Sequence, residues 1–277
     1  MKKFFSVFTA VLVLLTVFAL IPAQAKGDRL EQIKEKGYIE FCTEPYWAPN
    51  EFIDPNKTGD EQYVGCDIEL AKLIAEKIGV DLKINPLDFS AVLAGTASGK
   101  CDMAVSAIAW SPTREMAMRL SDGYSFDDTV GYGFLVREED VDKYTSIEDL
   151  AEATVITQSG SVQEAIYNQY CGNAKNFKLV ANMTDGYLAV AEKKADVCIT
   201  AIGSGELYAE ANGGLAVPDF KFDTDPQMSA TVVACPQDGT ETLMEAINEV
   251  IAEVVENGKY EEWEAEYKEY AKTLGLN

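Results

Sequence analysis

The chain contains no histidine, and its six cysteines are scattered without any Cys-x-x-Cys pair. Structural zinc sites use closely spaced Cys and His ligands, and a Ser-His-Asp triad needs an imidazole, so we expect neither. The sequence indicates no metal site and no cofactor. Disulfide pairing stays undecided, although Cys101 and Cys198 begin apolar strands, where a free cysteine usually acts as a small hydrophobic side chain.

Basic residues are also scarce. The chain has 23 Lys and Arg against 46 Asp and Glu, which gives a formal net charge of −23. A surface of that sign repels the phosphates of nucleic acids and the headgroups of anionic lipids. We therefore expect no nucleic-acid partner and no binding to an anionic membrane surface.

Long apolar runs are confined to the N-terminus. Two lysines precede an apolar run over residues 4–21, and Ala23-Gln24-Ala25 follows it, which is typical of a secretory signal peptide cleaved after Ala25. A retained membrane anchor is the alternative, which the small residues before the cleavage point disfavour. No later segment suits a membrane span, and the first cysteine, Cys42, lies too far on for a lipoprotein anchor. We expect a soluble periplasmic protein.

Strand-like and helix-like patterns alternate along the remaining chain, including an amphipathic helix over residues 66–78. Residues 92–108 predict a helix, a polar turn, Asp102 and a buried strand. The same order returns over residues 186–202 around Asp196. This alternation predicts an α/β protein with two similar lobes, each built on a mostly parallel sheet with helical cover.

The two lobes need connections. Two extended apolar runs, residues 132–137 and 229–234, look like paired strands that cross between the lobes. The chain would then leave the first lobe near Phe126 and return near Gln227. The expected units are a signal peptide (1–25), a first lobe (26–127 with 227–277) and a second lobe (128–226).

One arginine stands where a helix usually avoids a cation. Residues 103–122 predict a buried strand that runs into a helix. Ser111 suits the N-cap of this helix, Pro112 suits its first position, and Arg114 lies in the opening turn. A helix N-terminus carries partial positive charge, which disfavours a nearby cation unless an anion lies between them. We therefore expect an anion between the helix N-terminus and the Arg114 guanidinium. A solvated surface arginine is the alternative, but the strand before it ends where open α/β sheets bind ligands, which favours a carboxylate site.

Several motifs, in this order, amount to a family likeness. The chain contains TEPYWAPNEF, VGCDIELAKLIAEKIG, SGKCDMAVSAIAWSPTRE, TQSGSVQEA and NGKYEEW. It resembles the extracellular solute-binding proteins of ABC importers, in the polar amino-acid family (family 3). The resemblance implies a two-lobe type II periplasmic-binding-protein fold, with helices on both faces of each sheet and a two-strand hinge. It also implies a cleft that closes over a small ligand, which a permease in the inner membrane then receives. We expect a monomer.

The resemblance also implies roles for single residues of the first lobe. The aromatic side chain that stacks on the ligand falls on Trp47, and the arginine that binds its carboxylate falls on Arg114. Glu44 matches an acid that often meets the ligand side chain or a cationic group. Ser106 and Ala107 match the strand end that faces the cleft.

Three positions depart from the family pattern. Ala109, beside the bulky Trp110, stands where the family has a hydroxyl side chain. Val162 stands where a second hydroxyl usually follows the glycine of the second lobe. Ala201 stands where an aspartate normally holds the α-ammonium group. The candidate contacts of the second lobe are therefore Ser159, Ser161, Val162 and Ala201.

These departures bear on the ligand. An ammonium buried without an acid would leave a charge unpaired, at a cost of several kcal/mol. Either Glu44 or Glu206 replaces the missing aspartate, or the ligand carries no such ammonium. With Arg114 retained, the pattern predicts a carboxylate ligand that has more apolar or aromatic bulk than a polar amino acid.

Two other classes of function stay open. A periplasmic enzyme on the same scaffold, similar to a dehydratase, would need an acid or base in the cleft, for which Glu44, Glu206 or a cysteine is available. A sensor domain would dock to a membrane receptor, but such domains are usually fused to a transmembrane segment. We expect a binding protein and no enzyme.

Overall fold

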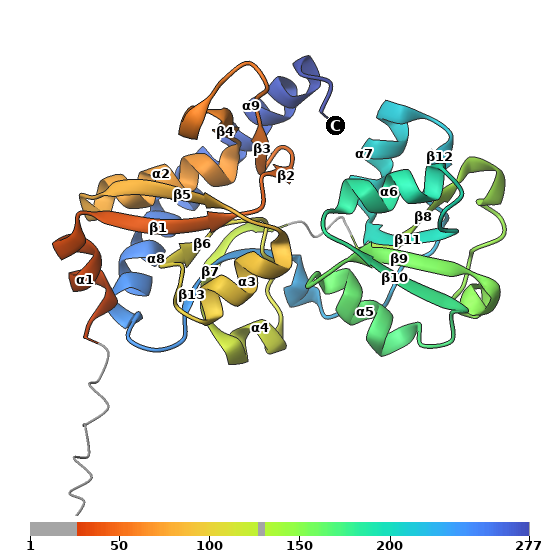
Figure 1. The fold of residues 1–277 in the computed structure, drawn as a ribbon, viewed down its shortest axis with the longest axis horizontal. Helices are drawn as coiled ribbons and strands as arrows, with labels where there is room; N and C mark the ends of the chain where they lie inside the picture. Colours follow the sequence, from red (N-terminus) through yellow and green to blue (C-terminus); the bar gives the residue numbers. More distant parts are fainter. Residues whose placement is uncertain (1–26, 127–130, 277) are drawn as a thin grey trace, which may run out of the picture.

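The computed structural model describes residues 27–126 and 131–276 (Figure 1). The predicted signal peptide (1–25) and Asp127, the expected end of the first segment of the first lobe, lie outside the described residues. Two five-stranded sheets form the two ends of the molecule, and helices cover them. The predicted two-lobe α/β architecture is confirmed.

The first sheet has the strand order β5-β1-β6-β13-β7. Strands β5, β1 and β6 are parallel to one another, and β13 is antiparallel to both of its neighbours. Four of the five strands, all except β13, therefore run in the same direction, as in a mostly parallel sheet. Its strands are β1 (Tyr38–Thr43), β5 (Asp81–Pro86), β6 (Met103–Ala104), β7 (Met118–Phe126) and β13 (Ala230–Pro236).

The second sheet has the order β10-β9-β11-β8-β12 and repeats this plan. Strands β10, β9 and β11 are parallel, and β8 is antiparallel to β11 and β12. Its strands are β8 (Tyr132–Arg137), β9 (Thr154–Gln158), β10 (Asn176–Val180), β11 (Val197–Ala201) and β12 (Leu215–Ala216). A small third sheet contains β2 (Tyr46–Trp47), β3 (Glu51–Ile53) and β4 (Tyr63–Val64).

Helices lie on both faces of the two large sheets (Figure 1). The α-helices are α1 (Arg29–Lys36), α2 (Cys66–Ile78), α3 (Phe89–Ala97), α4 (Pro112–Ala117), α5 (Val162–Tyr170), α6 (Met183–Ala191), α7 (Ile202–Asn212), α8 (Glu241–Glu256) and α9 (Lys259–Thr273). Short 3₁₀ turns are η1 (Gly59–Gln62), η2 (Glu138–Asp140), η3 (Glu148–Glu152) and η4 (Pro226–Ser229).

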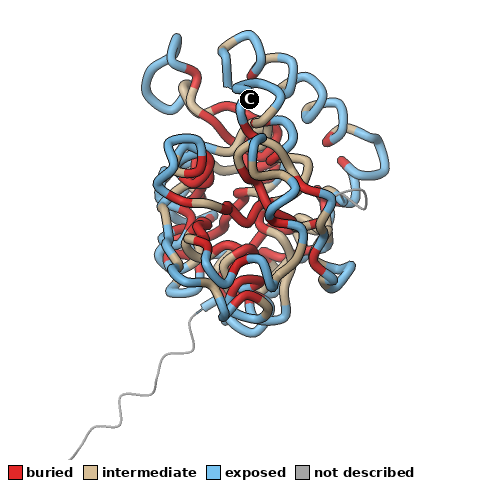
Figure 2. The backbone as a smooth tube through the Cα atoms, turned by 90° about the vertical axis from the view of Figure 1, so that its right-hand side faces the viewer, coloured by how far each residue is buried: buried red, intermediate tan, exposed pale blue. Residues whose placement is uncertain are grey.

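Successive residues of a buried strand enter different cores, because side chains alternate between the faces of a sheet. In β13, Val233 and Cys235 pack with α2 and α8, whereas Val232 and Ala234 pack with α3. Strand β8 alternates in the same way between a core with α5 and a core with α6 and α7. Figure 2 shows the buried segments of the backbone mostly toward the middle of the molecule and the exposed segments mostly around them.

Two predictions about the connecting segments were wrong. The helix that begins at Pro112 ends at Ala117, and the residues after it form β7 instead of continuing the helix to residue 122. The runs 132–137 and 229–234 do not pair with each other, because β13 pairs with β7 and β8 pairs with β11 and β12. In both cases hydrogen bonding to a neighbouring strand decides the structure of a segment whose local pattern is ambiguous.

The repeated pattern around Asp102 and Asp196 has a structural meaning. Asp102 donates its backbone N–H to the Glu40 carbonyl (2.8 Å) and accepts the Glu40 N–H at Oδ2 (2.7 Å). Asp196 makes the same two bonds to Thr154, at 2.8 and 2.9 Å. Each aspartate also pairs with an arginine of its own lobe, Arg29 or Arg137. The two lobes therefore begin their central strand in the same way.

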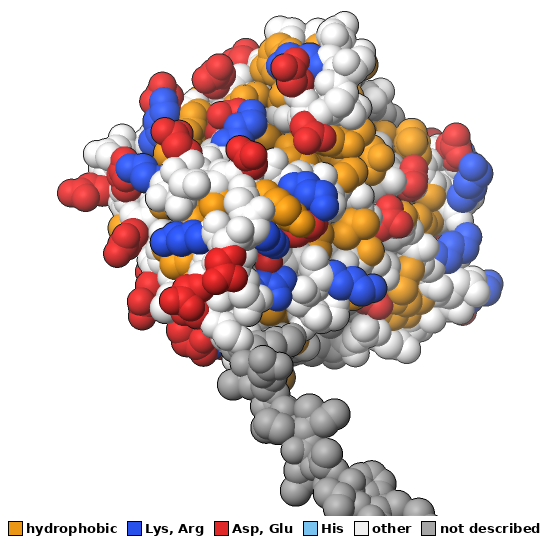
Figure 3. All heavy atoms as spheres, turned by 60° about the vertical axis from the view of Figure 1, so that its left-hand side comes forward, with side chains coloured by type: hydrophobic (Ala, Val, Ile, Leu, Met, Phe, Trp, Pro, Cys, Tyr) orange, Lys and Arg blue, Asp and Glu red, His pale blue; other side chains and the backbone are white. Residues whose placement is uncertain are grey.

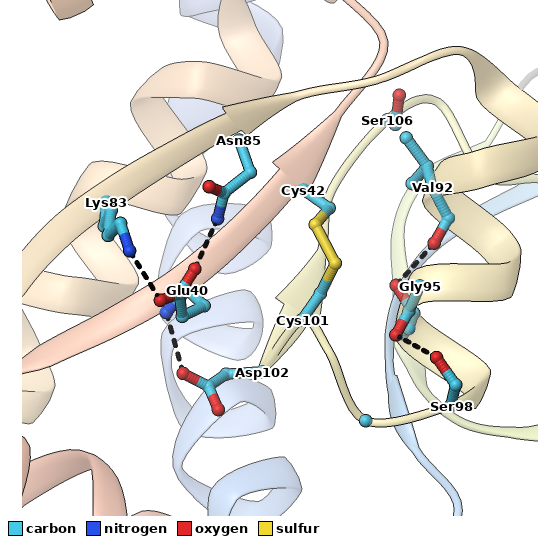
Figure 4. Close-up of a disulfide and its surroundings, with 12 residues drawn as sticks. Glu40, Cys42, Lys83, Asn85, Val92, Gly95, Ser98, Cys101, Asp102 and Ser106 are labelled. Carbon is cyan, nitrogen blue, oxygen red and sulfur yellow. Dashed lines mark hydrogen bonds and ion pairs between the residues drawn. A yellow bond between two sulfur atoms is a disulfide. The ribbon is translucent and has the colours of Figure 1, made fainter.

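A disulfide joins Cys42, at the end of β1, to Cys101, before β6, with a Cα–Cα distance of 5.9 Å (Figure 4). The interpretation of Cys101 as a free hydrophobic cysteine was therefore wrong, whereas Cys198 is free and buried. In Figure 4, Lys83 and Asn85 of β5 also converge on Glu40 of β1, beside Asp102. A disulfide, an ion pair and a hydrogen bond thus connect β1 to its neighbours in the first sheet.

Acidic and basic side chains are interspersed on the surface. On the face in Figure 3, Asp and Glu side chains lie among Lys and Arg, and no continuous basic tract forms. Within residues 27–126 and 131–276, no helix is long and apolar enough to cross a membrane.

We predict that Asp102→Asn lowers the free energy of unfolding by about 3 kcal/mol. The Asp102 side chain is fully buried and accepts from Arg29 at Oδ1 and from Lys36 at Oδ2, so the amide would remove the negative charge and replace one acceptor oxygen with an N–H donor. Urea denaturation followed by circular dichroism measures the change. Asp142→Asn, at an exposed position, is the control. Equal urea midpoints for the two variants would contradict this role of Asp102.

Candidate functional site

A cleft of about 2200 Å³ lies between the two sheets and is lined from both sides. The carboxyl ends of β1, β9 and β11 open into it, as expected for open α/β sheets. Nine of the ten predicted contacts line this cleft, namely Glu44, Trp47, Ser106, Ala107, Ala109, Arg114, Ser161, Val162 and Ala201.

Ser159 is the predicted contact that does not line the cleft. Its backbone N–H donates to the Val180 carbonyl (2.9 Å) and so continues the pairing of β9 with β10. Ser159 therefore extends β9 and is not part of the cleft lining.

Arg114 is buried, with 7% of its surface exposed. Ser111 caps the helix by accepting the Arg114 N–H (3.3 Å), and Pro112 occupies its first turn, as predicted. The guanidinium lies over the Phe89 ring, with its carbon 5.3 Å from the ring centre. Its Nη1 donates to the Ala109 carbonyl (2.6 Å) and its Nη2 to the Gly160 carbonyl of the second lobe (3.1 Å). Arg114 is therefore no solvated surface residue.

The charge of Arg114 is not balanced by the part of the protein that the structure describes. No acidic side chain among residues 27–126 and 131–276 forms an ion pair with it, and burial lowers its pKa to about 10. The guanidinium still carries a full charge at neutral pH. A planar cation with free N–H donors suits a carboxylate, which it can bind through two parallel hydrogen bonds.

Ser106 and Ala107 turn away from β6 at the cleft. Ala107 has a left-handed backbone with φ of 44°, and its N–H donates to Oδ2 of Asp67 (2.7 Å). Asp67 also accepts from the hydroxyls of Tyr124 (2.9 Å) and Tyr260 (2.6 Å). The buried carboxylate thus holds a strained bend in place. As a result, Ser106 Oγ accepts the Glu44 N–H (2.9 Å).

Glu44 is 4% exposed and lies on the cleft wall. Its Oε1 accepts from Nε2 of Gln158 across the cleft (2.8 Å), and Gln158 also donates to the Ala181 carbonyl (3.0 Å). Burial raises the pKa of Glu44 to about 7; the Gln158 bond opposes the rise, and Asp88 adds to it. This carboxyl is therefore poised between its charged and neutral forms near neutral pH.

Glu51 was missed by the sequence analysis. It lines the cleft, is 1% exposed and accepts from Ser106 Oγ at Oε1 (3.2 Å). No donor among the described residues reaches its other oxygen, Oε2. Burial, the charge of Asp67 and a hydrogen bond between the Glu51 and Asp67 carboxyls raise the pKa of Glu51 well above the usual value for glutamate. The only sequence signal was an acid directly before the apolar pair Phe52-Ile53.

The two tryptophans near the cleft occupy different positions. Trp47 lines the cleft and packs on the second lobe's core, which contains Tyr187 and Tyr208. Trp110 does not line the cleft and packs with Phe89 in a core of the first lobe. Trp110, the neighbour of Ala109, therefore lies outside the cleft lining.

The second lobe presents the start of α5 to the cleft. Ser161 caps this helix by accepting the Glu164 N–H (3.1 Å) and donates its own hydroxyl to the Gln158 carbonyl (2.7 Å). Gly160 has φ of +79°, and a Cβ there would lie 3.2 Å from Cα of Ser90 in α3. The two lobes thus approach closely at a position that suits only glycine.

Both acids that could replace the missing aspartate line the cleft with Ala201. Glu206 is exposed on α7, whereas Glu44 is buried. No group of three potential metal ligands occurs among residues 27–126 and 131–276. The described site thus offers a buried cation, buried carboxyls and an aromatic wall, which suits reversible binding of a small charged molecule.

Comparisons with known proteins agree with this geometry. The arginine-binding extracellular protein ArtP of Bacillus subtilis is 24% identical over 268 residues, covering 94% of this chain and 96% of that protein. The amino acid ABC transporter substrate-binding protein AbpA of Streptococcus pneumoniae, solved bound to L-arginine, has a TM-score of 0.77 and 29% identity. It covers 89% of this chain, and 99% of that structure is matched.

An enzyme is also among the relatives. The cyclohexadienyl dehydratase of Pseudomonas aeruginosa is 23% identical over 227 residues, covering 80% of this chain and 82% of that protein. The family model for bacterial extracellular solute-binding proteins, family 3, matches residues 39–270, so the chain belongs to that family.

Proposed function

We propose that this protein captures a small carboxylate-bearing ligand, an amino acid or an amino-acid-like compound, and delivers it to an ABC permease in the inner membrane. The observation that carries the proposal is the buried guanidinium of Arg114, which lines the cleft and has no acidic partner in the described residues. We assign the lobes to residues 26–127 with 227–277 and to 128–226. The protein acts as a periplasmic monomer after removal of residues 1–25.

Closure of the cleft is the functional step. A ligand shifts the equilibrium between open and closed forms only through contacts that the open form lacks. Arg114 already reaches the Gly160 carbonyl, and Glu44 already accepts from Gln158, so the two lobes meet at both ends of the ligand site. A ligand held by Arg114 and by the start of α5 would add contacts to both lobes at once.

The ligand combines charge with apolar bulk. Ala109, Val162 and Ala201 line the cleft without hydroxyl or carboxylate groups. A polar amino acid would find fewer hydrogen-bond partners there than the family pattern offers. Glu44 is the better substitute for the missing aspartate than Glu206, because it is buried in the wall where charge is poorly screened by water.

A second candidate function is a periplasmic enzyme similar to a dehydratase. Two observations favour it: the pKa of Glu44, near 7 in a cleft that also holds a buried arginine, and the similarity to cyclohexadienyl dehydratase. Mass spectrometry after incubation with a panel of hydroxy carboxylates tests it. Loss of water from a compound, abolished in Glu44→Gln, would support the enzyme over the binding protein.

We predict that Arg114→Ala weakens binding of the carboxylate ligand by tens to thousands-fold, equivalent to about 2 to 4 kcal/mol of charge-assisted hydrogen bonding. A thermal-shift screen of amino acids and plain carboxylates finds the ligand, and calorimetry measures its affinity. Arg119→Ala is the control, because Arg119 does not line the cleft. Unchanged affinity in Arg114→Ala would remove this residue from the site.

We predict that Gly160→Ala weakens ligand binding about tenfold or more, because a Cβ strains the left-handed backbone and pushes against α3 when the lobes close. Small-angle scattering should show a smaller ligand-induced compaction than in the wild type. Gly172→Ala is a matched control, since a Cβ there meets nothing within 4 Å. If both variants bind and compact equally, the close approach at Gly160 has no role in closure.

A further inference from the structure

One helix from each lobe borders the mouth of the cleft. Figure 1 shows α9, with the C-terminus beside it, and α7 near the top of the view, on the sides of their lobes that face each other. Residues of both helices line the cleft. The hydrogen bonds that already join the lobes come from other elements, since Arg114 donates to Gly160 and Gln158 donates to Glu44.

The two helices present opposite charges to the cleft. The acidic face of α7 is Glu206 and Glu210, and the basic face of α9 is Lys268 and Lys272; all four residues line the cleft. Within each face the two charges are four residues apart, so they lie on one side of the helix. Glu264 also belongs to the α9 stripe, where two cations therefore outnumber one acid.

Three of these four charges have no counter-charge in the ranges that the structure describes, 27–126 and 131–276. The side chains of Glu206, Glu210 and Lys268 are exposed and form no ion pair or hydrogen bond there. Lys272 pairs with Glu269 of its own helix (2.7 Å), which leaves further N–H donors on its ammonium group. Both faces can therefore accept a partner of opposite charge.

Exposed apolar side chains accompany these charges on both sides of the mouth. Tyr46 of β2 is 52% exposed, Leu207 of α7 is 39% exposed, and Leu276 after α9 is 36% exposed. All three line the cleft. Exposed apolar groups rimmed by charged residues are typical of contact surfaces. Contact between the two sides would remove these groups from water.

We propose that the acidic face of α7 and the basic face of α9 bind each other when the cleft closes, with Leu207 packed against Tyr46 and Leu276. Because this α7–α9 contact exists only in the closed form, it favours closure of the empty protein, and a ligand supplies only the remainder of the free energy. The inference goes beyond the proposed function, since no ligand takes part. It also gives Glu206 a role other than holding an ammonium group.

Double electron–electron resonance on the empty protein measures the ratio of closed to open molecules. Spin labels at Ala265→Cys on α9 and Asp219→Cys beside α7 occupy exposed positions outside this cleft. The four native free thiols are buried, so the labels react at the introduced cysteines. Closure brings the two helices together, and the shorter of two distance populations is therefore the closed form.

Charge reversal tests the electrostatic part of the contact. Glu206→Lys with Glu210→Lys should lower the closed-to-open ratio about threefold or more, because like charges then face each other. Adding Lys268→Glu and Lys272→Glu should restore the ratio.

The matched control for the α7 reversal is Glu245→Lys with Glu249→Lys. These residues occupy exposed positions of α8 outside the cleft, also four residues apart, and the change of net charge is the same. This control should leave the closed-to-open ratio near the wild-type value. Circular dichroism confirms that each variant is folded.

Salt and an apolar variant give two further readouts. The screening length falls from about 10 Å at 0.1 M salt to about 3 Å at 1 M, so 1 M KCl should lower the closed-to-open ratio of the wild type. General repulsion between two acidic lobes would instead make the ratio rise with salt. Leu207→Ser should lower the ratio, whereas Leu188→Ser, at an exposed position of α6 outside the cleft, should not.

Three results would overturn the α7–α9 contact. They are equal ratios in the wild type, the α7 reversal and the α8 control; a wild-type ratio that rises with salt; and a fourfold variant that does not recover. A distance signal between singly labelled molecules would show that a second copy covers these faces, which also excludes the proposal. Capture of a carboxylate is tested separately by Arg114→Ala and is unaffected by any of these results.

Discussion

The carboxylate of Asp67 is the interaction on which the shape of the binding wall depends. It stands in the first turn of α2 and accepts from Ala107 of the strand end, Tyr124 of β7 and Tyr260 of α9. One buried carboxylate therefore connects α2 to the end of β6, to the edge strand β7 of the first sheet and to α9. It also holds the left-handed bend at Ala107, which sets the direction of Ser106 and, through its hydroxyl, of the loop that begins at Glu44.

The cleft holds a buried cationic group and a buried acidic group, Arg114 and Glu44. The guanidinium of Arg114 and the carboxyl of Glu44 are both buried, and each forms a hydrogen bond to the opposite lobe. In neither case does the bond neutralise the group, because the partners are a carbonyl and an amide. A buried charge without a counter-charge costs free energy, which a ligand of complementary charge would offset.

The sequence predicted most of the architecture, because long periodic segments and glycine stops reflect local physics. The cap at Ser111 and the paired aspartates Asp102 and Asp196 were also visible in the pattern. The secondary structure of residues 118–126 was not predicted, since their composition fits a strand and a short helix equally well. Hydrogen bonding to β13 makes them a strand. Glu51 was missed for a related reason. The position of Glu51 depends on the small β2-β3-β4 sheet, which no local period of the sequence encodes.

The arrangement of thiols has a consequence for how the chain reaches its native state. One disulfide joins Cys42 to Cys101, while Cys66, Cys171, Cys198 and Cys235 remain reduced and sealed inside the two lobes. Burial protects these four from oxidants once the protein has folded. A chain that meets an oxidising compartment while still unfolded offers all six sulfurs for wrong pairings. Rapid burial of the four spare thiols, and not only formation of the native bridge, then determines the yield of correctly paired protein.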